Sequence, residues 1–158
     1  MLIRHATAGN LDEIYPLWKA LETFYDNDPS NKACHKWRKN TLSLIKNLKS
    51  GGLYIALKKK KIIGYLSYQF VKRKNGPLEH CVFLSELYVI PSARNLGVAT
   101  KLINRLFQEK LPSFIAKYAV TTHPKAANVI KLYTRMGFNK VGKTKAGNVL
   151  LEKRLTPH

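Results

Sequence analysis

The sequence predicts a single α/β domain over residues 1–158. Three observations support this fold class. Apolar residues make up 45% of the chain, which suffices for one buried core. Segments with strand character alternate with segments whose apolar residues recur at helical spacing. No repeat or linker interrupts them, so we expect helices packed around a mixed sheet.

The N-terminal part is expected to form one strand and two helices. Residues 2–6 read as a strand, and Asn10 as the N-cap of a helix. The apolar face of this helix consists of Leu11, Ile14, Trp18, Leu21 and Tyr25. Pro16 conflicts with the helix, so we expect a kink or a delayed start. A second helix, with Trp37, Ile45 and Leu48 on one stripe, should end at Ser-Gly-Gly, residues 50–52.

Three strands are expected next. Residues 53–57 and 62–71 are apolar and β-rich, and they flank four lysines at 58–61, so they predict a hairpin with a solvated tip. A basic turn over 72–77 leads to a strand over 81–90 that Pro91 ends.

The C-terminal part alternates between helices and strands. We expect helices over 97–111 and 125–136, with a buried strand over 114–121 between them. Gly137 stands where a left-handed C-cap belongs. Residues 138–141 and 149–155 are the last predicted strands.

The net charge of +19 is distributed unevenly. Residues 1–28 hold two basic and five acidic residues, whereas the remainder holds 26 basic and four acidic ones. Such a field favours a polyanion, which could be a nucleic acid, a membrane surface or a phosphorylated cofactor. Charge alone does not choose among them.

Several classes of protein and site are not expected. The sequence has no 18-residue apolar run and no apolar signal core, so we expect no membrane span and a cytoplasmic location. Cys34 and Cys81 lie far apart and should be reduced thiols. The five histidines lack metal-ligand spacing, so no metal site is expected.

The strongest chemical signal lies in residues 84–100. A strand ends at Pro91, a short basic loop follows, and a helix begins at Gly97. The free N–H groups of a helix's first turn can bind a pyrophosphate, and a glycine allows close approach. Arg94 could add a charge-assisted hydrogen bond. Neither G-x-x-x-x-G-K-S/T nor G-x-G-x-x-G occurs in the sequence.

This stretch resembles motif A of the GNAT superfamily of acetyltransferases, Arg/Gln-x-x-Gly-x-Gly/Ala after a strand that ends in Tyr-Val-x-Pro. Arg94, Gly97 and Ala99 match the motif in order, while Asn95 departs from the frequent glycine. Residues 130–138 resemble the family's LYxxxGF helix end. The element order also matches, so nearly the whole chain is identified as a member. The resemblance implies a mixed, mostly antiparallel sheet flanked by helices and splayed at its two central strands.

The resemblance further implies acetyl-CoA as co-substrate and direct acetyl transfer to a primary amine. The pantetheine arm would bind the backbone of Leu87, Tyr88 and Val89, and an N–H near residue 88 would bind the oxyanion. The cofactor loop would comprise Arg94, Asn95, Leu96, Gly97, Val98, Ala99 and Thr100. Relatives often contact the pantetheine through an asparagine where this chain has Ala126. Asn128 is the candidate replacement, or else an ordinary first-turn residue.

Two residues are expected to do the chemistry. Tyr133 matches the family's general acid, since a phenol with a pKa of about 10 is protonated at neutral pH and can donate to a thiolate. The alternative is a core tyrosine. Glu86 is expected to take the amine's proton through water or to attract the amine. The alternative is a sheet carboxylate paired with a lysine.

In relatives the connection between the first two helices lines the acceptor site. Here it contains Glu22, Tyr25, Asp26 and Asp28, which predict a cationic acceptor, either a small amine or a protein amine. A solvated loop is the alternative. The sequence does not name the acceptor or the oligomeric state, although dimers are common in the family. A second hypothesis is a GNAT-fold binding module that docks on RNA, ribosome or DNA with little acetylation. It is not favoured, because the sequence lacks a nucleic-acid motif and an aromatic-interleaved basic stripe.

Overall fold

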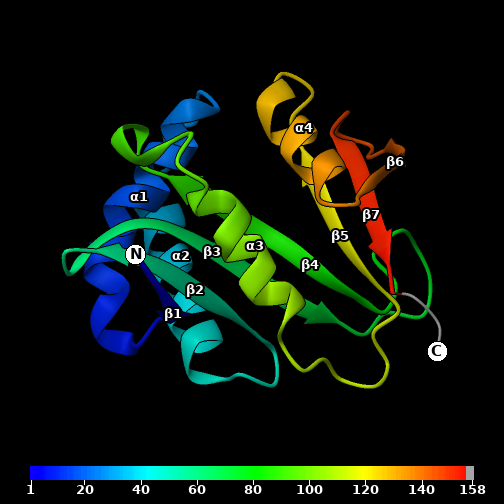
Figure 1. Ribbon diagram of the computed structural model, residues 1–158, viewed down its shortest axis with the longest axis horizontal. Helices are drawn as coiled ribbons and strands as arrows, with labels where there is room; N and C mark the ends of the chain where they lie inside the picture. Colours follow the sequence, from blue (N-terminus) through cyan, green and yellow to red (C-terminus); the bar gives the residue numbers. More distant parts are fainter. Residues whose placement is uncertain (156–158) are drawn as a thin grey trace. The chain divides into compact units, whose positions relative to one another are not determined.

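The computed structural model describes residues 1–155, so the last three residues of the predicted domain lie outside the described residues. The elements follow in the order β1 (Leu2–His5), η1 (Ala8–Asn10), α1 (Leu11–Phe24), α2 (Asn31–Lys46), β2 (Gly51–Lys58), β3 (Lys61–Val71), β4 (Cys81–Val89), η2 (Pro91–Ala93), α3 (Val98–Phe107), β5 (Lys117–Thr122), α4 (Ala127–Arg135), β6 (Asn139–Lys143) and β7 (Val149–Arg154). This order confirms the predicted alternation of strands and helices (Figure 1).

The seven strands found within residues 1–155 form one sheet in the order β1-β2-β3-β4-β5-β7-β6. The pairs β1–β2, β5–β7 and β6–β7 are antiparallel, whereas β4 and β5 are parallel. The predicted mixed, mostly antiparallel sheet is therefore confirmed. The parallel register covers only Cys81–Phe83 with Lys117–Ala119, although β4 continues to Val89.

The chain divides into two compact units. Unit 1 consists of Met1–Ser67 and Glu86–Glu109, and unit 2 consists of Tyr68–Ser85 and residues 110–155. Both β3 and β4 contribute residues to each unit.

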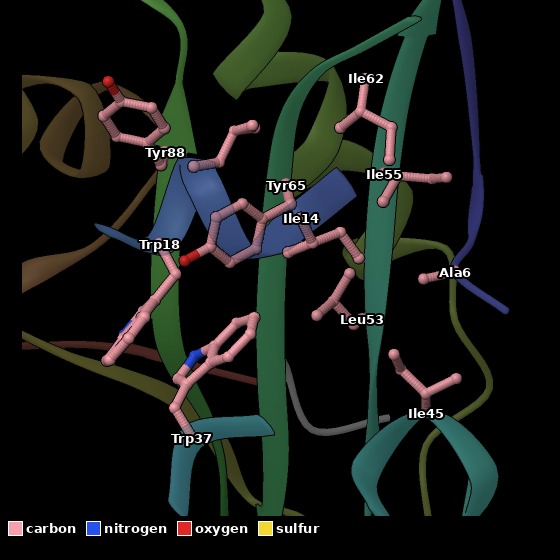
Figure 2. Packing of buried hydrophobic residues seen from close by; sticks show 11 residues of the cluster. Ala6, Ile14, Trp18, Trp37, Ile45, Leu53, Ile55, Ile62, Tyr65 and Tyr88 are labelled. Carbon is pink, nitrogen blue, oxygen red and sulfur yellow. The ribbon is translucent and has the colours of Figure 1, made fainter. Parts of the chain in front are cut away.

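The core of unit 1 is built on both faces of β2. Leu53 and Ile55 join a cluster with apolar residues of α1 and α2 (Figure 2). Tyr54, which lies between them, is fully buried and reaches α3 on the other face. Because side chains alternate along a strand, α1 and α2 pack on one face of β2 and α3 on the other. A strand buried on both faces accounts for the continuous apolar run in the sequence.

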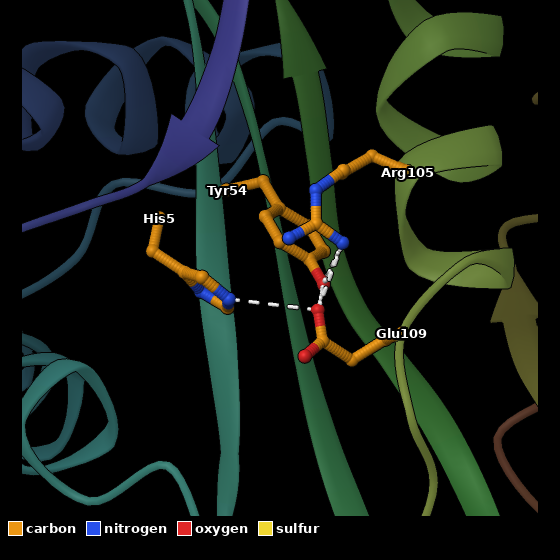
Figure 3. A network of polar contacts seen from close by, with 4 residues as sticks. All are labelled: His5, Tyr54, Arg105 and Glu109. Carbon is orange, nitrogen blue, oxygen red and sulfur yellow. Dashed lines mark hydrogen bonds and ion pairs between the residues drawn. The ribbon is translucent and has the colours of Figure 1, made fainter.

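A polar network fastens α3 to the first two strands (Figure 3). The Glu109 carboxylate accepts hydrogen bonds from the Tyr54 hydroxyl and from Arg105 Nη1, the latter at 2.9 Å. Its Oε2 also lies 3.5 Å from His5 Nε2. Burial alone would raise the pKa of Glu109, but Tyr54, Arg105 and His5 outweigh it, so the pKa is lowered.

The first helix departs from expectation at its start. It begins at Leu11 and runs through Pro16, so of the two predicted effects of this proline the delayed start does not occur. Burial of its apolar face, which includes Ile14, retains helical structure despite the missing N–H. Asn10 stands at the predicted N-cap position but does not cap α1, because its Oδ1 accepts the Thr7 N–H at 2.8 Å.

The region after α2 also differs from the prediction. Leu48 lies beyond the end of α2 and is 56% exposed, so it does not belong to the buried stripe of Trp37 and Ile45. Residues 51–52 belong to β2 instead of ending the helix. At the hairpin tip, Lys59 and Lys60 have φ of 51° and 65°. Two successive positive φ values are characteristic of a type I′ turn, so the tip is tighter than the four-lysine loop suggests.

In unit 2 the end of α4 follows the predicted left-handed cap. Gly137 has φ 97°, its N–H donates to Thr134 O at 3.1 Å, and the Phe138 N–H donates to Tyr133 O at 3.0 Å. The Tyr133 and Phe138 rings meet edge to face at 5.2 Å. These bonds and the apolar contact form a Schellman motif. The Tyr-x-x-x-Gly-Phe sequence is therefore the C-terminal capping motif of α4.

Several boundaries differ from the prediction in this part of the chain. The predicted helix over 97–111 ends at Phe107, and the predicted strand over 114–121 begins at Lys117. A turn in which the Ile115 N–H donates to Pro112 O, at 3.1 Å, occupies the start of that predicted strand. The last helix begins at Ala127 instead of residue 125, after a turn at His123.

Candidate functional site

The loop between β4 and α3 adopts an anion-binding geometry. Gly97 is the N-cap residue of α3 with φ 79°, and Asn95 also has a positive φ of 63°. Within residues 1–155, the backbone N–H groups of residues 96–100 donate to no acceptor of the chain. Free N–H groups together with the positive end of the helix dipole favour an anion at this point.

The glycine at 97 is required by conformation and not by crowding inside unit 1. A Cβ built on Gly97 would meet nothing within 4 Å. Its φ of 79° nevertheless favours glycine, and the absent side chain keeps the amides open to an approaching group. Asn95 departs from the family's frequent glycine, but asparagine is among the few residues that tolerate a left-handed conformation.

Arg94 is held at the entrance of this loop. Its Nε donates to Val89 O at 2.9 Å, and its guanidinium carbon lies 5.4 Å from the centre of the Tyr88 ring. No acceptor among residues 1–155 bonds its terminal Nη groups. The guanidinium is therefore oriented while two of its donor groups stay available for an anion.

The backbone of β4 next to the loop has one occupied and one open edge. Ile90 and Tyr88 direct backbone groups toward β3. The Ile90 N–H donates to Ile63 O at 2.9 Å, and Tyr88 O lies 3.0 Å from the position that a Cβ on Gly64 would occupy. By alternation, Leu87 and Val89 direct theirs to the other edge. The binding of a ligand by the backbone of Leu87, Tyr88 and Val89 stays a prediction, in which Leu87 and Val89 are the two that face away from β3.

Glu86 lies in an aromatic environment in unit 1. Its Oε1 accepts hydrogen bonds from Trp37 Nε1 and from Tyr65 Oη, both at 3.2 Å. Burial raises the pKa of Glu86; the hydrogen bonds from Trp37 and Tyr65 act against this rise, and the charge of Glu22 adds to it. The alternative reading, a carboxylate paired with a lysine, is wrong, because no ion pair among residues 1–155 includes Glu86.

The hydrogen-bond donors to Glu86 were not predicted from the sequence, although the two tryptophans on the helix faces indicate one of them. Trp18 and Trp37 were predicted on the apolar faces of the first two helices, and their rings stack at 4.9 Å (Figure 2). An indole in the core needs an acceptor for its N–H. A lone carboxylate on the central strand is the acceptor that Trp37 finds.

The residues predicted to bind the acceptor amine lie in different environments in the structure. Glu22 lies within α1, and its charge acts on Glu86. Its Oε2 accepts a hydrogen bond from Asn27 Nδ2 at 2.9 Å. Asp26 and Asp28 are exposed on the connection to α2, and burial raises the pKa of Tyr25. Glu22 is thus the member of the predicted acidic patch that the structure links to Glu86.

The remaining predicted residues belong to unit 2. The Tyr133 side chain is buried, with its ring against Phe138. Asn128 is exposed in the first turn of α4, and Ala126 is buried at the N-cap position.

Other kinds of site receive no support from residues 1–155. In this range no group of three or more His, Cys, Asp or Glu side chains could hold a metal ion. Both cysteines are free, and burial raises the pKa of Cys81 to about 11, which keeps its thiol protonated. No helix in the same range is both long and apolar enough to span a membrane.

An open, mostly antiparallel sheet whose central strand leads into an anion-binding loop and helix has the architecture of an acyltransferase. The chain belongs to the acetyltransferase (GNAT) family, whose sequence model matches residues 11–138. No curated protein sequence matches it at a significant level.

Solved structures share the fold at low sequence identity. A ribosomal-protein-alanine N-acetyltransferase from Brucella melitensis is 23% identical, with 98% of this chain and 100% of that chain covered at a TM-score of 0.75. The PaiA N-acetyltransferase from Thermoplasma acidophilum, in complex with coenzyme A, is 15% identical over 98% of both chains, with a TM-score of 0.74. The yncA protein of Salmonella typhimurium, with its cofactor acetyl-CoA, is 18% identical over 100% of this chain and 95% of that chain, with a TM-score of 0.75.

Proposed function

We propose that this protein is an N-acetyltransferase that moves the acetyl group of acetyl-CoA directly to a primary amine. The observation that carries the proposal is the loop before α3, where an oriented Arg94 and free backbone N–H groups surround a left-handed Gly97. The pyrophosphate of acetyl-CoA matches these donors in charge and hydrogen bonding. The complexes of two fold relatives with coenzyme A and acetyl-CoA support this assignment.

The open edge of β4 suits the pantetheine arm. The N–H and C=O of Leu87 and the N–H of Val89 face away from β3 and can pair with a ligand. The Val89 carbonyl is not counted, because it already accepts a hydrogen bond from Arg94. An amide-containing arm can pair with these groups as an added strand does. One of these N–H groups would also stabilise the oxyanion.

In the proposed reaction the acceptor nitrogen attacks the thioester carbonyl, so that a C–N bond forms and the C–S bond breaks. Glu86 accepts the proton that the amine nitrogen loses, directly or through water. The Tyr133 hydroxyl donates a proton to the departing thiolate and regains one from solvent. A carboxyl with a raised pKa is a better base near neutral pH than an ordinary one, which suits Glu86 to this role.

The acceptor that fits best is a cationic primary amine. Glu22 and Glu86 interact electrostatically in unit 1, and two carboxylates attract a protonated amine. A panel of small cationic amines, neutral amines and peptide N-termini, with thiol release as readout, tests the transfer reaction. We expect release above the hydrolysis background for cationic amines. A folded protein that binds acetyl-CoA but acetylates no amine would contradict the proposal.

Tyr133→Phe tests the general acid. We expect kcat to fall by about 10²–10⁴-fold with little change in the KM for acetyl-CoA, because the lost interaction belongs to the transition state. Tyr118→Phe is the matched control, since Tyr118 is another buried tyrosine of unit 2 with no assigned chemistry. Equal kcat values for wild type and Tyr133→Phe, with chemistry rate-limiting, would leave Tyr133 as a packing residue.

A further inference from the structure

Unit 2 contains a long stretch without acidic residues. Residues 110–151 include eight lysines and arginines and no aspartate or glutamate. The next carboxylate, Glu152, is already engaged by Lys117 at 2.8 Å and by Arg154 at 3.4 Å. The other cations of this stretch therefore have no carboxylate partner within the described residues.

Five of these cations are exposed on α4, on β6 and on the turn after it. We call them the basic surface: Lys131, Arg135, Lys140, Lys143 and Lys145. On α4, the first two are four residues apart and share one face of the helix. Every residue of β6 is exposed, and β6 is the edge strand beside β7.

A bulge in β6 places both of its lysines on the same face of the sheet. Lys140 pairs with Leu151 and Lys143 with Val149, and the register shifts between them. Leu151 and Val149 are two residues apart and point to the same face. Residues three apart in a regular strand would point to opposite faces, so the bulge brings the two lysines together.

The same face carries the end of α4. Lys153, two residues from Leu151, donates from Nζ to Met136 O at 2.9 Å, just after the last turn of that helix. Arg135, in that last turn, therefore lies on the same side of the sheet as the β6 lysines. Lys153 itself is engaged with the helix end, so it is not counted in the basic surface.

Lys145 sits on an ordered turn next to this face. The Thr144 N–H donates to Asn148 O at 2.9 Å, and the Gly147 N–H donates to Thr144 O at 2.9 Å. Asn148 N–H also donates to Thr144 Oγ1 at 3.1 Å. These bonds fix the turn while Lys145 stays exposed at its tip.

We propose that the basic surface binds the phosphodiester backbone of a nucleic acid, independently of acetyl transfer. The described residues of unit 2 expose two large hydrophobics, Val141 and Leu155, and neither is aromatic. A membrane anchor or a protein interface would need a larger apolar centre, and base recognition in single strands usually uses aromatic stacking. Phosphate contacts without base contacts are independent of sequence and dependent on salt.

Fluorescence anisotropy with a labelled mixed-sequence 20-base-pair RNA duplex tests this binding. For the wild-type protein we expect log K to fall against log salt with a slope of about −4 to −5, since five cations each release about 0.9 counterion. The variant Lys140→Gln/Lys143→Gln/Lys145→Gln should reduce the magnitude of the slope by about 3 and weaken binding at least about tenfold at 0.1 M salt.

The matched control is Lys58→Gln/Lys60→Gln/Lys61→Gln, at the exposed hairpin tip of unit 1, which has the same net charge. We expect it to bind the duplex nearly as wild type does. The variant Lys140→Arg/Lys143→Arg/Lys145→Arg should preserve binding, which separates loss of charge from loss of fold. Equal weakening in both glutamine variants would overturn the proposal, since binding would then follow net charge alone. Equal affinity for polyglutamate or for phosphatidylserine vesicles at the same salt would also overturn it.

Discussion

At the scale of single residues, Glu86 shows how a site arises from distant parts of the chain. Its two hydrogen-bond donors, Trp37 and Tyr65, lie 49 and 21 residues away in the sequence. A carboxylate on the central strand was predicted from the chain alone. Its aromatic surroundings were not, because they depend on how α1 and α2 pack against β3 and β4. The raised pKa that suits it to proton transfer follows from that packing.

Glu86→Gln tests this residue through pH. As a base, Glu86 must be ionised, so we expect wild-type kcat/KM to fall below a pH that lies above the ordinary glutamate pKa of about 4.3. The isosteric glutamine should lower kcat/KM by about 10²–10⁴-fold and remove this acid limb. Glu79→Gln, at a partly exposed carboxylate of unit 2, should leave the profile unchanged. An acid limb that persists in Glu86→Gln would contradict the assignment.

The same variant has a signature in stability. Because the folded pKa of Glu86 is raised, the native state holds this proton more tightly than the unfolded state does. The stabilisation is therefore present at pH values below the ordinary glutamate pKa and is lost as pH rises through the folded pKa. Urea unfolding at several pH values should show this decline in wild type and a smaller decline in Glu86→Gln.

The loop before α3 shows what a motif can and cannot predict. The requirement for glycine at 97 follows from a strand–loop–helix pattern, and its φ of 79° agrees with that reading. The left-handed conformation of Asn95 was not anticipated, although it accounts for the departure from the family's glycine. The bond from Arg94 Nε to Val89 O is a tertiary contact that no local pattern contains.

At the scale of elements, the order of strands and helices was predictable and their boundaries were less so. Hydrophobic periodicity identified the seven strands and four α-helices that the structure describes between residues 1 and 155. It extended α2 to Leu48, which follows the end of the helix. Leu48 continues the helical spacing of apolar residues, so the sequence pattern alone does not show that the helix has already ended. It also began β5 too early, at residue 114, because Phe114 and Ile115 make the preceding turn as apolar as a strand.

The Schellman motif at the end of α4 allows a test of element stability. Gly137→Ala should destabilise the protein by about 1–2 kcal/mol, since a left-handed conformation costs alanine that amount. Gly137→Asn should lose less stability than Gly137→Ala, because asparagine tolerates the left-handed conformation better than alanine does. Gly142→Ala, where a Cβ meets nothing within 4 Å and φ is not left-handed, should change stability by less than about 0.5 kcal/mol. Equal unfolding midpoints for Gly137→Ala and Gly142→Ala would refute the capping role.

At the scale of the whole molecule, the sequence predicted a strong positive field but not its arrangement. The excess of basic residues after residue 28 was evident from composition. The bulge that turns Lys140 and Lys143 to one face of unit 2 depends on strand register, which no single segment encodes. A protein of net charge +19 attracts the polyanionic acetyl-CoA at long range, and we expect Arg94 to convert this attraction into a specific contact.

Calorimetric titration of acetyl-CoA into wild-type, Arg94→Ala and Arg73→Ala proteins tests the central claim most directly. Arg73 is an exposed arginine on the basic turn after β3, so the two variants have the same net charge. We expect wild type and Arg73→Ala to bind acetyl-CoA with the same affinity. Arg94→Ala should raise the Kd about 10- to 100-fold, because a charge-assisted hydrogen bond contributes about 1.5–3 kcal/mol. An unchanged Kd in a folded Arg94→Ala protein would contradict the assignment of this loop as the acetyl-CoA site.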